Sequence, residues 1–268
     1  SCLIISKEII DKNLDKKPYI LVNDTLKALH DLSRFVRSRS KAKFIAITGS
    51  NGKTTVKEMI AHILSDHKIC YTKDNFNNHI GVPLTLLSIK QDEDYVIIEV
   101  GANNLGEIRP LANIINPDVA AVTNIGYAHI EGFKTLDNTA QEKYSIFDYV
   151  KKDGFSVIND QKEYRKFIKK GNKVFFGYKN DFYYKFKRKL KNFFYKTEFF
   201  YIQRINKDLY QFKKSFSKIK LKLSINGEHN YQNAACAASI ALCLGFKLKD
   251  IISKLESFKG VISRLKLY

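Results

Sequence analysis

The chain has 268 residues, 44% of them hydrophobic, with 46 Lys and Arg against 27 Asp and Glu, which gives a formal net charge of +19. That length is sufficient for one large domain or two smaller ones with a sizeable core, and the hydrophobic content is typical of a soluble globular protein. No apolar run reaches the roughly 18 residues that a membrane span needs, so the sequence predicts no membrane-spanning helix.

The first 41 residues are expected to be the tail of a preceding domain followed by a connecting helix. Two short apolar runs, Leu3–Ser6 and Tyr19–Val22, are typical of strands, and Asp24 stands where a helix cap is expected. Apolar residues at helical spacing then predict an apolar stripe along this helix. They are Leu26, Leu29, Leu32, Phe35 and Val36.

From residue 44 to residue 160 the pattern alternates between strands and helices. The predicted strands are Phe44–Thr48, Ile69–Thr72, Tyr95–Val100, Val119–Thr123 and Phe155–Ile158, and the predicted helices are Val56–Leu64, Glu107–Ile115 and Thr139–Val150. A loop, Asp74–Pro83, is expected before the apolar segment Leu84–Ile89. Such alternation predicts an α/β fold with a mostly parallel sheet flanked by helices, in which ligands bind beyond the carboxyl ends of the strands.

Residues 161–222 have a different composition, rich in Lys, Phe and Tyr and poor in Gly and Pro, as in Asp181–Arg188. Their alternation is closer to a period of two, which predicts a smaller antiparallel β portion at a sheet edge. Basic residues interleaved with aromatic ones are also compatible with stacking on single-stranded nucleic acid. No RNA-binding signature is present, so a half-buried sheet with a Lys-rich solvent face is the favoured interpretation. The net charge of the chain is compatible with a nucleic acid or an acidic ligand, and the high content of Lys, Asn, Ile, Phe and Tyr favours a composition bias as its source.

The last part of the chain predicts two helices. The first opens at Gly227–Ala234 and ends at Gly245, and the second covers about Lys249–Phe258. Small residues along the first helix allow close packing against a sheet or a ligand. They are Ala234, Ala235, Ala237, Ala238 and Ala241. Val261–Tyr268 has the pattern of a further strand.

The chemistry is concentrated in the stretch Phe44–Thr55, where an apolar strand, a glycine turn and a helix follow one another. Glycines allow backbone N–H groups to approach a phosphate, and the helix N-terminus adds its dipole. Lys53 is then expected to reach the terminal phosphates, and the Thr54 hydroxyl to bind Mg²⁺. The alternative is an ordinary turn between strand and helix with a lysine there by chance. The predicted phosphate loop consists of Gly49, Ser50, Asn51, Gly52, Lys53, Thr54 and Thr55.

Further polar residues follow the strands that end at the same edge of the sheet. Glu99 is a candidate Mg²⁺ ligand or else a solvated acid at a strand end, and His129 is a candidate metal ligand or a structural histidine. Lys143, judged by its neighbours alone, has the pattern of a surface lysine. Asn230 and Asn233 lie beside His229 at a helix start, where asparagine caps backbone groups or reads a base edge.

The four cysteines, at positions 2, 70, 236 and 243, have neither a CxxC nor a zinc-ligand spacing. Cys236 and Cys243 are seven residues apart on a helical pattern, which is typical of core packing. We therefore expect reduced thiols and, since no signal peptide is visible, a cytoplasmic protein.

These motifs, in this order, resemble those of the Mur ligases, the ATP-dependent amide-bond-forming enzymes of peptidoglycan assembly. The resemblance rests on Thr48–Thr55, Asn77–Leu87, Glu99–Asn103, Gly106–Ile108, Thr123–Gly126, His129–Phe133 and Gly227–Asn233, and covers about residues 20–160 and 224–268. Within the family, the Asn-rich loop and the His129–Phe133 stretch are most similar to the members that join D-alanyl-D-alanine to UDP-N-acetylmuramoyl-tripeptide.

The resemblance implies ATP and Mg²⁺ as cofactors and assigns roles to individual residues. Lys53 and Thr54 would serve the phosphates and a first Mg²⁺, which Glu99 would also bind. His129 would bind a second Mg²⁺, and Lys143 would bind metal as a carbamate. On the same basis Asn230 and Asn233 would lie beside the adenine, Arg264 would contact the γ-phosphate, and Asn77 and Asn78 would face the substrate.

The family resemblance also implies three domains, of which this chain is expected to contain the central one. Residues 1–41 would be a remnant of the UDP-substrate domain, residues 42–262 the ATP-binding domain, and residues 263–268 a stub of the C-terminal domain. We expect a monomer that binds ATP and does not ligate on its own. The alternatives are another Mur ligase, a folylpolyglutamate synthase-like ligase, or a basic nucleic-acid-binding module.

Overall fold

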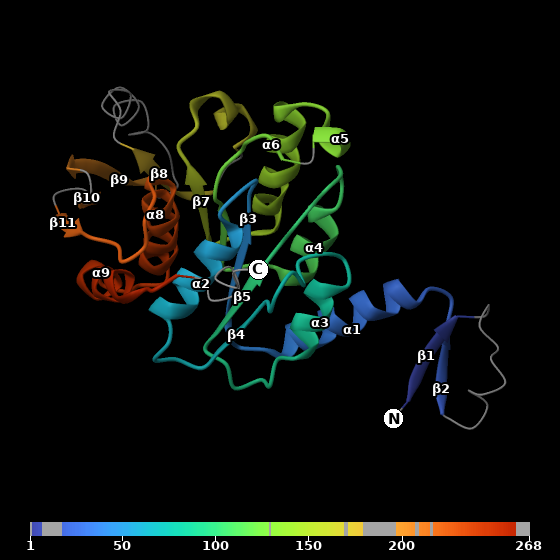
Figure 1. The fold of residues 1–268 in the computed structure, drawn as a ribbon. Helices are drawn as coiled ribbons and strands as arrows, with labels where there is room; N and C mark the ends of the chain where they lie inside the picture. The colour runs from blue at the N-terminus through green and yellow to red at the C-terminus, as the bar shows by residue number, and fades with distance from the viewer. Residues whose placement is uncertain are drawn as a thin grey trace, which may run out of the picture.

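The computed structural model describes residues 2–6, 18–128, 130–168, 171–178, 197–206, 209–214 and 217–260. Its centre is a sheet whose strands run in the order β11-β10-β9-β8-β7-β6-β3-β5-β4, with helices on both faces (Figure 1). Neighbouring strands from β4 through to β9 are parallel, and β10 and β11 are antiparallel to their neighbours. The predicted α/β fold with a mostly parallel sheet and a smaller antiparallel portion is confirmed.

The strands of the main sheet are short, and glycine or polar residues follow most of them. They are β3 (Lys43–Thr48), β4 (Ile69–Tyr71), β5 (Tyr95–Glu99), β6 (Val119–Val122), β7 (Phe155–Asn159), β8 (Asn172–Tyr178), β9 (Thr197–Asn206), β10 (Leu209–Lys214) and β11 (Ser217–Leu221). A separate parallel pair, β1 (Leu3–Ser6) and β2 (Tyr19–Val22), lies at the far end of the first helix (Figure 1).

Two hydrophobic cores lie on opposite faces of the main sheet, because successive residues of a strand point to opposite sides. Ile45 and Ile47 of β3 pack in the core with α2 (Lys53–Ile63), α8 (Glu228–Cys243) and α9 (Leu248–Ser257). Phe44 and Ala46 belong to the core on the other face. The helices of that face are α3 (Gly81–Leu87), α4 (Ile108–Ile115), α5 (Ile130–Phe133) and α6 (Leu136–Tyr144), with 3₁₀ turns at Ser145–Tyr149 and Lys162–Phe167.

Helix α8 has the tight packing that its alanines predict. Ala234, Ala235, Ala237, Ala238 and Ala241 are all fully buried, as is Cys236. Small side chains let a helix backbone approach its neighbours closely, so α8 packs against both α2 and β8. None of the four cysteines, all in the described part of the chain, forms a disulfide.

The connecting helix α1 (Thr25–Arg39) begins at Asp24, whose side chain accepts hydrogen bonds from the backbone N–H groups of Leu26 and Lys27, as predicted. Its predicted apolar stripe is only partly covered, since Val36 packs against the core whereas Leu32 and Phe35 are exposed. The buried residues are Ser33 and Arg37. Arg37 donates to the carbonyl oxygens of Ile115 and Asn116 at the end of α4, so its face of α1 is held against α4, and α1 packs against α3 as well.

The prediction for residues 161–222 is partly wrong. Strand β8 runs parallel to β7, and β9 parallel to β8, so the antiparallel portion begins only at the β9–β10 pair. Period-two alternation marks a half-buried strand but does not determine the direction of its partner. The segment 179–196 between β8 and β9 is long enough for a parallel crossover. The Lys/Tyr-rich run Asp181–Arg188 and the predicted strand Val261–Tyr268 lie outside the described residues.

The boundaries of three helices also differ from the prediction. Helix α2 begins at Lys53 instead of Val56. Helix α3 begins at Gly81, inside the predicted loop, because Pro83 is in the first turn, where a backbone N–H is not needed. Helix α6 begins at Leu136, because the side chain of Thr135 accepts a hydrogen bond from the backbone N–H of Asn138 and caps it. The helix changes to a 3₁₀ turn at Ser145 instead of continuing to Val150.

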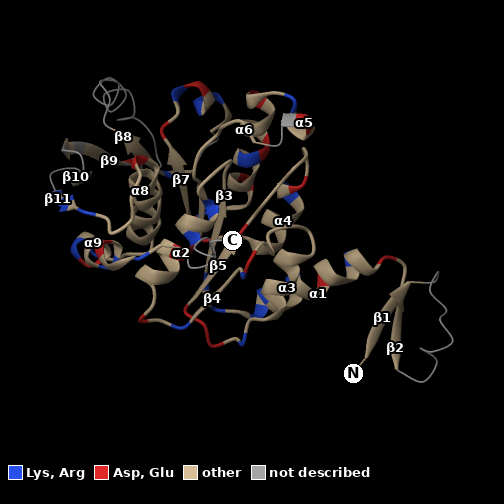
Figure 2. Ribbon diagram, in the orientation of Figure 1, with Lys and Arg blue, Asp and Glu red and all other residues tan. Residues whose placement is uncertain are grey.

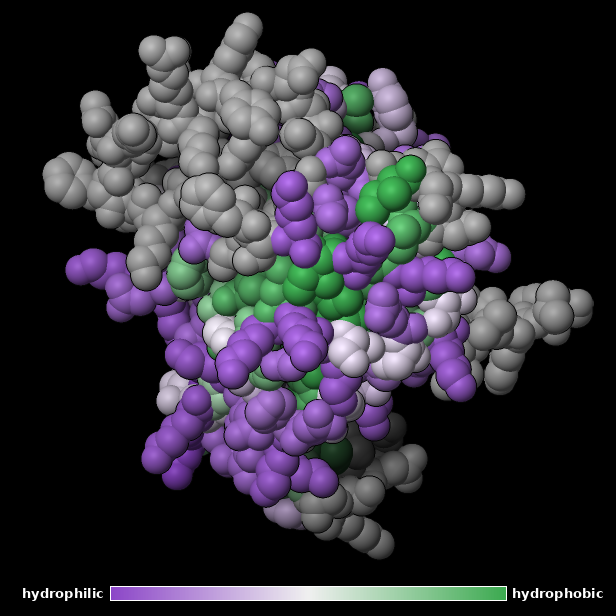
Figure 3. Space-filling model, turned by 90° about the vertical axis from the view of Figure 1, so that its left-hand side faces the viewer, coloured by the Kyte–Doolittle hydropathy of each residue, from purple (hydrophilic) through white to green (hydrophobic). Residues whose placement is uncertain are grey.

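Charged residues are distributed over many elements of the described chain. Figure 2 shows Lys and Arg on α9, β11, α2, α6 and α1 alike. Viewed from the side of β11 and α9, hydrophilic side chains surround a narrow apolar band (Figure 3). This spread of positive charge over several faces is in keeping with a composition bias.

Candidate active site

A pocket of about 760 Å³ opens at the carboxyl ends of the parallel strands, between the turn after β3 and the start of α8. Its residues come from segments far apart in the sequence, which the parallel strands bring to one rim of the sheet. The lining consists of Ser50, Asn51, Gly52, Lys53, Thr54, Thr55, Asn75, Asn77, Glu99, Thr123, Asn124, Ile225, His229, Asn230, Gln232, Asn233, Lys259 and Gly260. Four residues, Lys53, Thr54, Glu99 and His129, were expected to converge on one pocket. The first three line this pocket, and His129 lies outside the described residues.

The two glycines of the turn bring it close to its neighbours. Gly49 has a φ of +147° and Gly52 a φ of +81°, the latter in the left-handed region that favours glycine. A Cβ on Gly49 would lie 1.9 Å from Thr123 Oγ1, and a Cβ on Gly52 would lie 2.3 Å from Asn233 Oδ1. Only residues without a side chain allow the turn to contact both the segment after β6 and helix α8.

Side chains after β6 hold the turn in place. Thr123 Oγ1 donates a hydrogen bond of 2.5 Å to the carbonyl oxygen of Asn51, whose N–H donates to Asn124 Oδ1 at 2.9 Å. Ser50 Oγ donates to the carbonyl oxygen of Gly126 and lies equally close, at 2.9 Å, to the Gly126 N–H, which donates to it. Sequence reasoning assigned no individual role to Thr123 or Asn124. Their position directly after a buried strand on the same rim was the available signal.

Lys53 and Thr54 occupy the first turn of α2, with Gly52 as its N-cap. The Lys53 ammonium donates to the carbonyl oxygens of Gly49 at 2.9 Å and Ser50 at 3.3 Å, so it lies folded over its own loop. The backbone N–H groups of the first helical turn have no partners within the helix and are available to an anion. The turn thus has the geometry of a phosphate-binding loop.

Glu99 ends β5 and is 2% exposed. Its Oε1 accepts a hydrogen bond of 2.9 Å from Asn77 Nδ2, and its backbone N–H donates to Thr72 Oγ1 at 3.0 Å. Its other carboxylate oxygen, Oε2, is buried without a hydrogen-bond partner among the described residues. A buried, unpartnered carboxylate oxygen is costly unless a cation or a donor completes it. Glu99 therefore has one oxygen that is suited to a metal ion.

The described residues contain no group of three or more His, Cys, Asp or Glu side chains that could by themselves hold a metal ion. Glu99 and the Thr54 hydroxyl both line the pocket, and such a sparse set of oxygen ligands suits Mg²⁺, which usually retains waters and binds through one or two carboxylates and substrate phosphates. His129 and Arg264 lie outside the described residues, so the structure does not place them.

The two asparagines expected to face a substrate have different surroundings. Asn77 lines the pocket but uses its amide to hold Glu99. Asn78 is not among the lining residues, and its Oδ1 accepts hydrogen bonds from the N–H groups of Ile80 and Gly81, at the start of α3.

Lys143 lies on α6 and is 1% exposed, so its surface interpretation is wrong. Burial is the largest influence on its pKa, which falls from 10.5 to about 8, and the charge of Lys53 lowers it further, whereas Glu142 opposes the change. Glu142 is itself buried and accepts hydrogen bonds of 2.7 Å from the N–H groups of Gly106 and Ile108 at the start of α4. This carboxylate ties α6 to α4. Lys143 is not among the pocket-lining residues, but it is close enough to Lys53 for their charges to interact.

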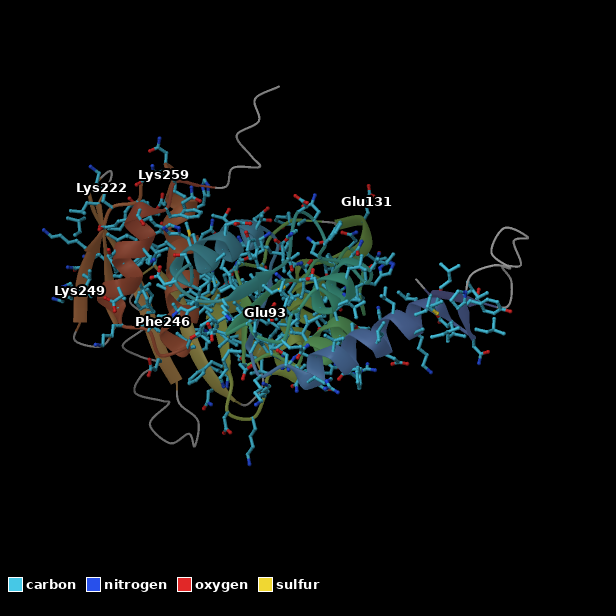
Figure 4. All side chains as sticks on the ribbon, turned by 90° about the horizontal axis from the view of Figure 1, so that it is seen from below. Glu93, Glu131, Lys222, Phe246, Lys249 and Lys259 are labelled. Atoms are coloured by element: carbon cyan, nitrogen blue, oxygen red, sulfur yellow. The ribbon has the colours of Figure 1, made fainter. Side chains whose placement is uncertain are left out.

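Asn230 and Asn233 both line the pocket from the first turns of α8. The capping interpretation is wrong, because the N-cap is Gly227 and no side chain caps the helix there. Asn230 Nδ2 donates to the carbonyl oxygen of Asn226 at 2.7 Å, and Asn233 Nδ2 lies 3.4 Å from Asn230 Oδ1. Lys259 borders the same pocket after α9, at the end of the molecule where Figure 4 also labels Lys222 and Lys249.

Comparison with known families identifies the architecture. The Mur ligase middle domain family matches residues 47–241, from the phosphate loop through most of α8. The chain belongs to the Mur ligase family. The resemblance expected from the motifs is thus confirmed, and most of the residues that line the pocket lie within the matched range.

Two curated Mur ligases and one solved structure illustrate the match. The UDP-N-acetylmuramoyl-tripeptide–D-alanyl-D-alanine ligase of Buchnera aphidicola subsp. Acyrthosiphon pisum is 38% identical over 239 residues, which are 87% of this chain and 50% of that protein. The ligase of the same name from Escherichia coli K12 is 33% identical over 252 residues, 92% of this chain and 54% of that protein. MurF from Acinetobacter baumannii superposes with a TM-score of 0.83 at 32% identity, covering 98% of this chain and 55% of that one.

A more distant Mur ligase shares the fold. MurF from Thermotoga maritima, solved in complex with ADP, has a TM-score of 0.77 at 23% identity and covers 98% of this chain and 58% of that one. The chain spans about half the length of the curated relatives it matches. No described helix has both the length and the hydrophobicity required for a membrane crossing.

Proposed function

We propose that this chain is the ATP-binding part of an enzyme that joins D-alanyl-D-alanine to UDP-N-acetylmuramoyl-tripeptide in peptidoglycan synthesis. The names of the relatives and their 33–38% identity over most of the chain support this assignment. The observation that carries it is the convergence of Lys53 and Thr54, from the start of α2, and Glu99, from the end of β5, on a single pocket. The family match over residues 47–241 supports a central ATP-binding domain over residues 42–262.

In this proposal the triphosphate of ATP binds at the glycine turn. Backbone N–H groups, the dipole of α2 and the Lys53 ammonium compensate its negative charge. Lys53 would exchange the loop carbonyls of Gly49 and Ser50 for phosphate oxygens. Asn230 and Asn233, on the other side of the pocket, have amide groups suited to the adenine edge, and Arg264 is assigned to the γ-phosphate by the family resemblance.

Mg²⁺ would be held by Oε2 of Glu99 and the hydroxyl of Thr54. When bound, the ion neutralises charge on the β- and γ-phosphates. Asn77 keeps the Glu99 carboxylate oriented, because it occupies Oε1 and leaves Oε2 for the metal. Family resemblance assigns a second Mg²⁺ to His129 and to Lys143 as a carbamate, and the lowered pKa of the buried Lys143 supplies the neutral amine that carbamylation requires.

The carboxylate of the tripeptide does not react with an amine unless it is first activated, and the phosphoryl group of ATP provides this activation. The γ-phosphoryl group passes to the carboxylate of the tripeptide, which gives an acyl phosphate, and ADP is left. The amine of D-alanyl-D-alanine then attacks the carbonyl carbon, and the tetrahedral intermediate collapses with loss of phosphate. No side chain of this chain needs to act as a nucleophile, because positioning and charge compensation by the loop and Lys53 are sufficient.

Nucleotide binding by the chain can be tested by thermal unfolding with and without AMPPNP and Mg²⁺. We expect the analogue to raise the melting temperature of the wild-type chain. Lys53→Ala should abolish this shift, whereas Lys254→Ala, which removes a lysine paired with Asp66 on the surface, should retain it. An unchanged shift in Lys53→Ala would mean that the phosphate loop is wrongly assigned.

The acceptor can be tested with a full-length protein that contains this chain. We expect ADP release that depends on both UDP-N-acetylmuramoyl-tripeptide and D-alanyl-D-alanine. ADP release that depends on another amino acid, or on glutamate together with a folate, would favour another Mur ligase or a folylpolyglutamate synthase-like ligase. The isolated chain, which spans about half the length of its relatives, should bind nucleotide without ligating.

A further inference from the structure

Lys57 is a charged residue in the core to which the proposed function assigns no role. It lies on α2, is 1% exposed and is among the largest fully buried side chains. Its neighbours Val56 and Ile60 on the same helix are apolar and belong to the core. Burying an ammonium group is costly unless hydrogen bonds and an opposite charge compensate it, so its partners indicate what it does there.

Lys57 has one partner on its own helix and two at the carboxyl end of β4. Its Nζ donates a hydrogen bond of 2.7 Å to the carbonyl oxygen of Thr72, the residue that follows β4. Nζ also lies 3.1 Å from Glu58 Oε1 and 5.8 Å from the centre of the Tyr71 ring. The lysine therefore connects the helix of the phosphate loop to the end of a neighbouring strand.

Thr72 carries this connection on to Glu99. It is fully buried, and its Oγ1 accepts the 3.0 Å hydrogen bond from the backbone N–H of Glu99. Its own N–H donates to the carbonyl oxygen of Ile97 on β5, also at 3.0 Å. Thr72 therefore contacts Lys57 through its carbonyl oxygen and the backbone of Glu99 through its hydroxyl.

Helix α2 carries both Lys57 and one of the two proposed metal ligands. Lys57 comes four residues after Lys53, about one helical turn, so both lie on neighbouring parts of one face of α2. Thr54, the proposed second metal ligand, is in the first turn of that helix. The hydrogen bond from Lys57 to Thr72 therefore connects the helix that carries Thr54 to the strand end that carries Glu99.

We propose that Lys57 is a positioning residue that, through Thr72, holds the Glu99 carboxylate at the correct distance from Thr54 and so determines the affinity of the nucleotide site for Mg²⁺. This inference rests on the proposed Mg²⁺–ATP site. A purely structural role, in which Lys57 only stabilises the packing of α2 on the sheet, predicts lower stability with unchanged metal dependence.

The test compares AMPPNP affinity in excess Mg²⁺ with AMPPNP affinity in EDTA, both by isothermal titration calorimetry. The ratio of the two affinities is the gain due to the metal. Lys57→Met retains the length and packing of the side chain. We expect the metal-dependent gain in affinity to be about 10-fold smaller in this variant, the usual loss when a residue that orients a metal ligand is replaced. Affinity in EDTA should stay at the wild-type value. Lys254→Met removes the same charge from α9 and should retain the full gain.

A second pair of variants tests the same connection without removing the lysine. Thr72→Val lacks the hydroxyl that accepts from Glu99, and Thr72→Ser retains it, so only the first should lose the metal-dependent gain. The inference is overturned if Lys57→Met folds and keeps the wild-type gain. If Lys57→Met does not fold, equal gains in Thr72→Val and Thr72→Ser overturn it. Absence of any gain in the wild-type chain would instead refute the proposed Mg²⁺–ATP site itself.

Discussion

Gly52→Ala places one methyl group at the contact between the phosphate loop and α8. Gly52 has φ +81° and ψ −4°, where alanine costs about 1–2 kcal/mol of backbone strain. The new Cβ would lie 2.3 Å from Asn233 Oδ1 and 3.1 Å from its Cγ, so the amide must rotate away from its contact with Asn230. That rearrangement costs about 1 kcal/mol. We expect the free energy of unfolding to fall by about 2–3 kcal/mol in total.

A matched control separates the two contributions. Gly245, just after α8, has φ +93°, and a Cβ there would meet nothing within 4 Å. Gly245→Ala should therefore cost only the backbone strain, about 1–2 kcal/mol. Urea unfolding followed by circular dichroism measures both variants. In an Asn233→Ala background, the cost of Gly52→Ala should fall to that of Gly245→Ala.

The same variants separate stability from binding. Gly52→Ala displaces Asn233 in the pocket and should weaken AMPPNP binding, whereas Gly245→Ala should leave it unchanged. Equal destabilisation by the two substitutions, or an undiminished cost of Gly52→Ala in the Asn233→Ala background, would refute the close contact between the turn and α8.

Three further predictions concern the metal site, the buried lysine and the packing of α1. The variant Glu99→Gln still has an oxygen that accepts from Asn77, but it loses the negative charge. Calorimetry should therefore show that the Mg²⁺-dependent gain in AMPPNP affinity is smaller by about 10-fold or more. An unchanged gain would exclude Glu99 as a metal ligand. Because the pKa of Lys143 is lowered to about 8, its neutral fraction should rise from about one tenth at pH 7 to about nine tenths at pH 9. A carbamate signal in ¹³C NMR with labelled bicarbonate should grow over that range and be missing in Lys143→Met; the same signal in the variant would contradict the assignment. Arg37→Ala removes two hydrogen bonds to carbonyl oxygens at the end of α4 and the stacking of the guanidinium over the Phe44 ring at 3.6 Å. Urea unfolding should show that the free energy of unfolding falls by about 3 kcal/mol. A decrease below about 1 kcal/mol would mean that other contacts hold α1 in place.

Several features of the fold could be predicted because they depend on local patterns. The apolar, β-branched run Phe44–Thr48 predicts a buried strand, and the glycines with Lys53 predict the turn and the start of the helix after it. The rule for parallel strands predicts that Glu99 lies on the same rim as the turn. Glu99 and Ile47 are paired across β5 and β3, so the rule applies directly here.

Other features depend on contacts that local patterns do not encode. The stripe on α1 predicts a buried Phe35, but the contact with α4 buries Arg37 instead. Residues around Lys143 are typical of a surface helix, and only the packing of α6 against its neighbours buries it. The period-two alternation after β7 likewise predicts strands but does not show that β8 and β9 run parallel to their neighbours.

By itself, the sequence determined the alternation of strands and helices over residues 44–160, the glycine turn before α2 and the family, because hydrophobic periodicity, glycine turns and motif spacing are properties of neighbouring residues. Only the tertiary structure decided that Asn233 packs on Gly52, that Asn77 holds one oxygen of Glu99, and that Lys57 reaches Thr72. These contacts join segments that are separate in the chain, and their existence depends on distances set by the packing of α2 and α8 on the sheet.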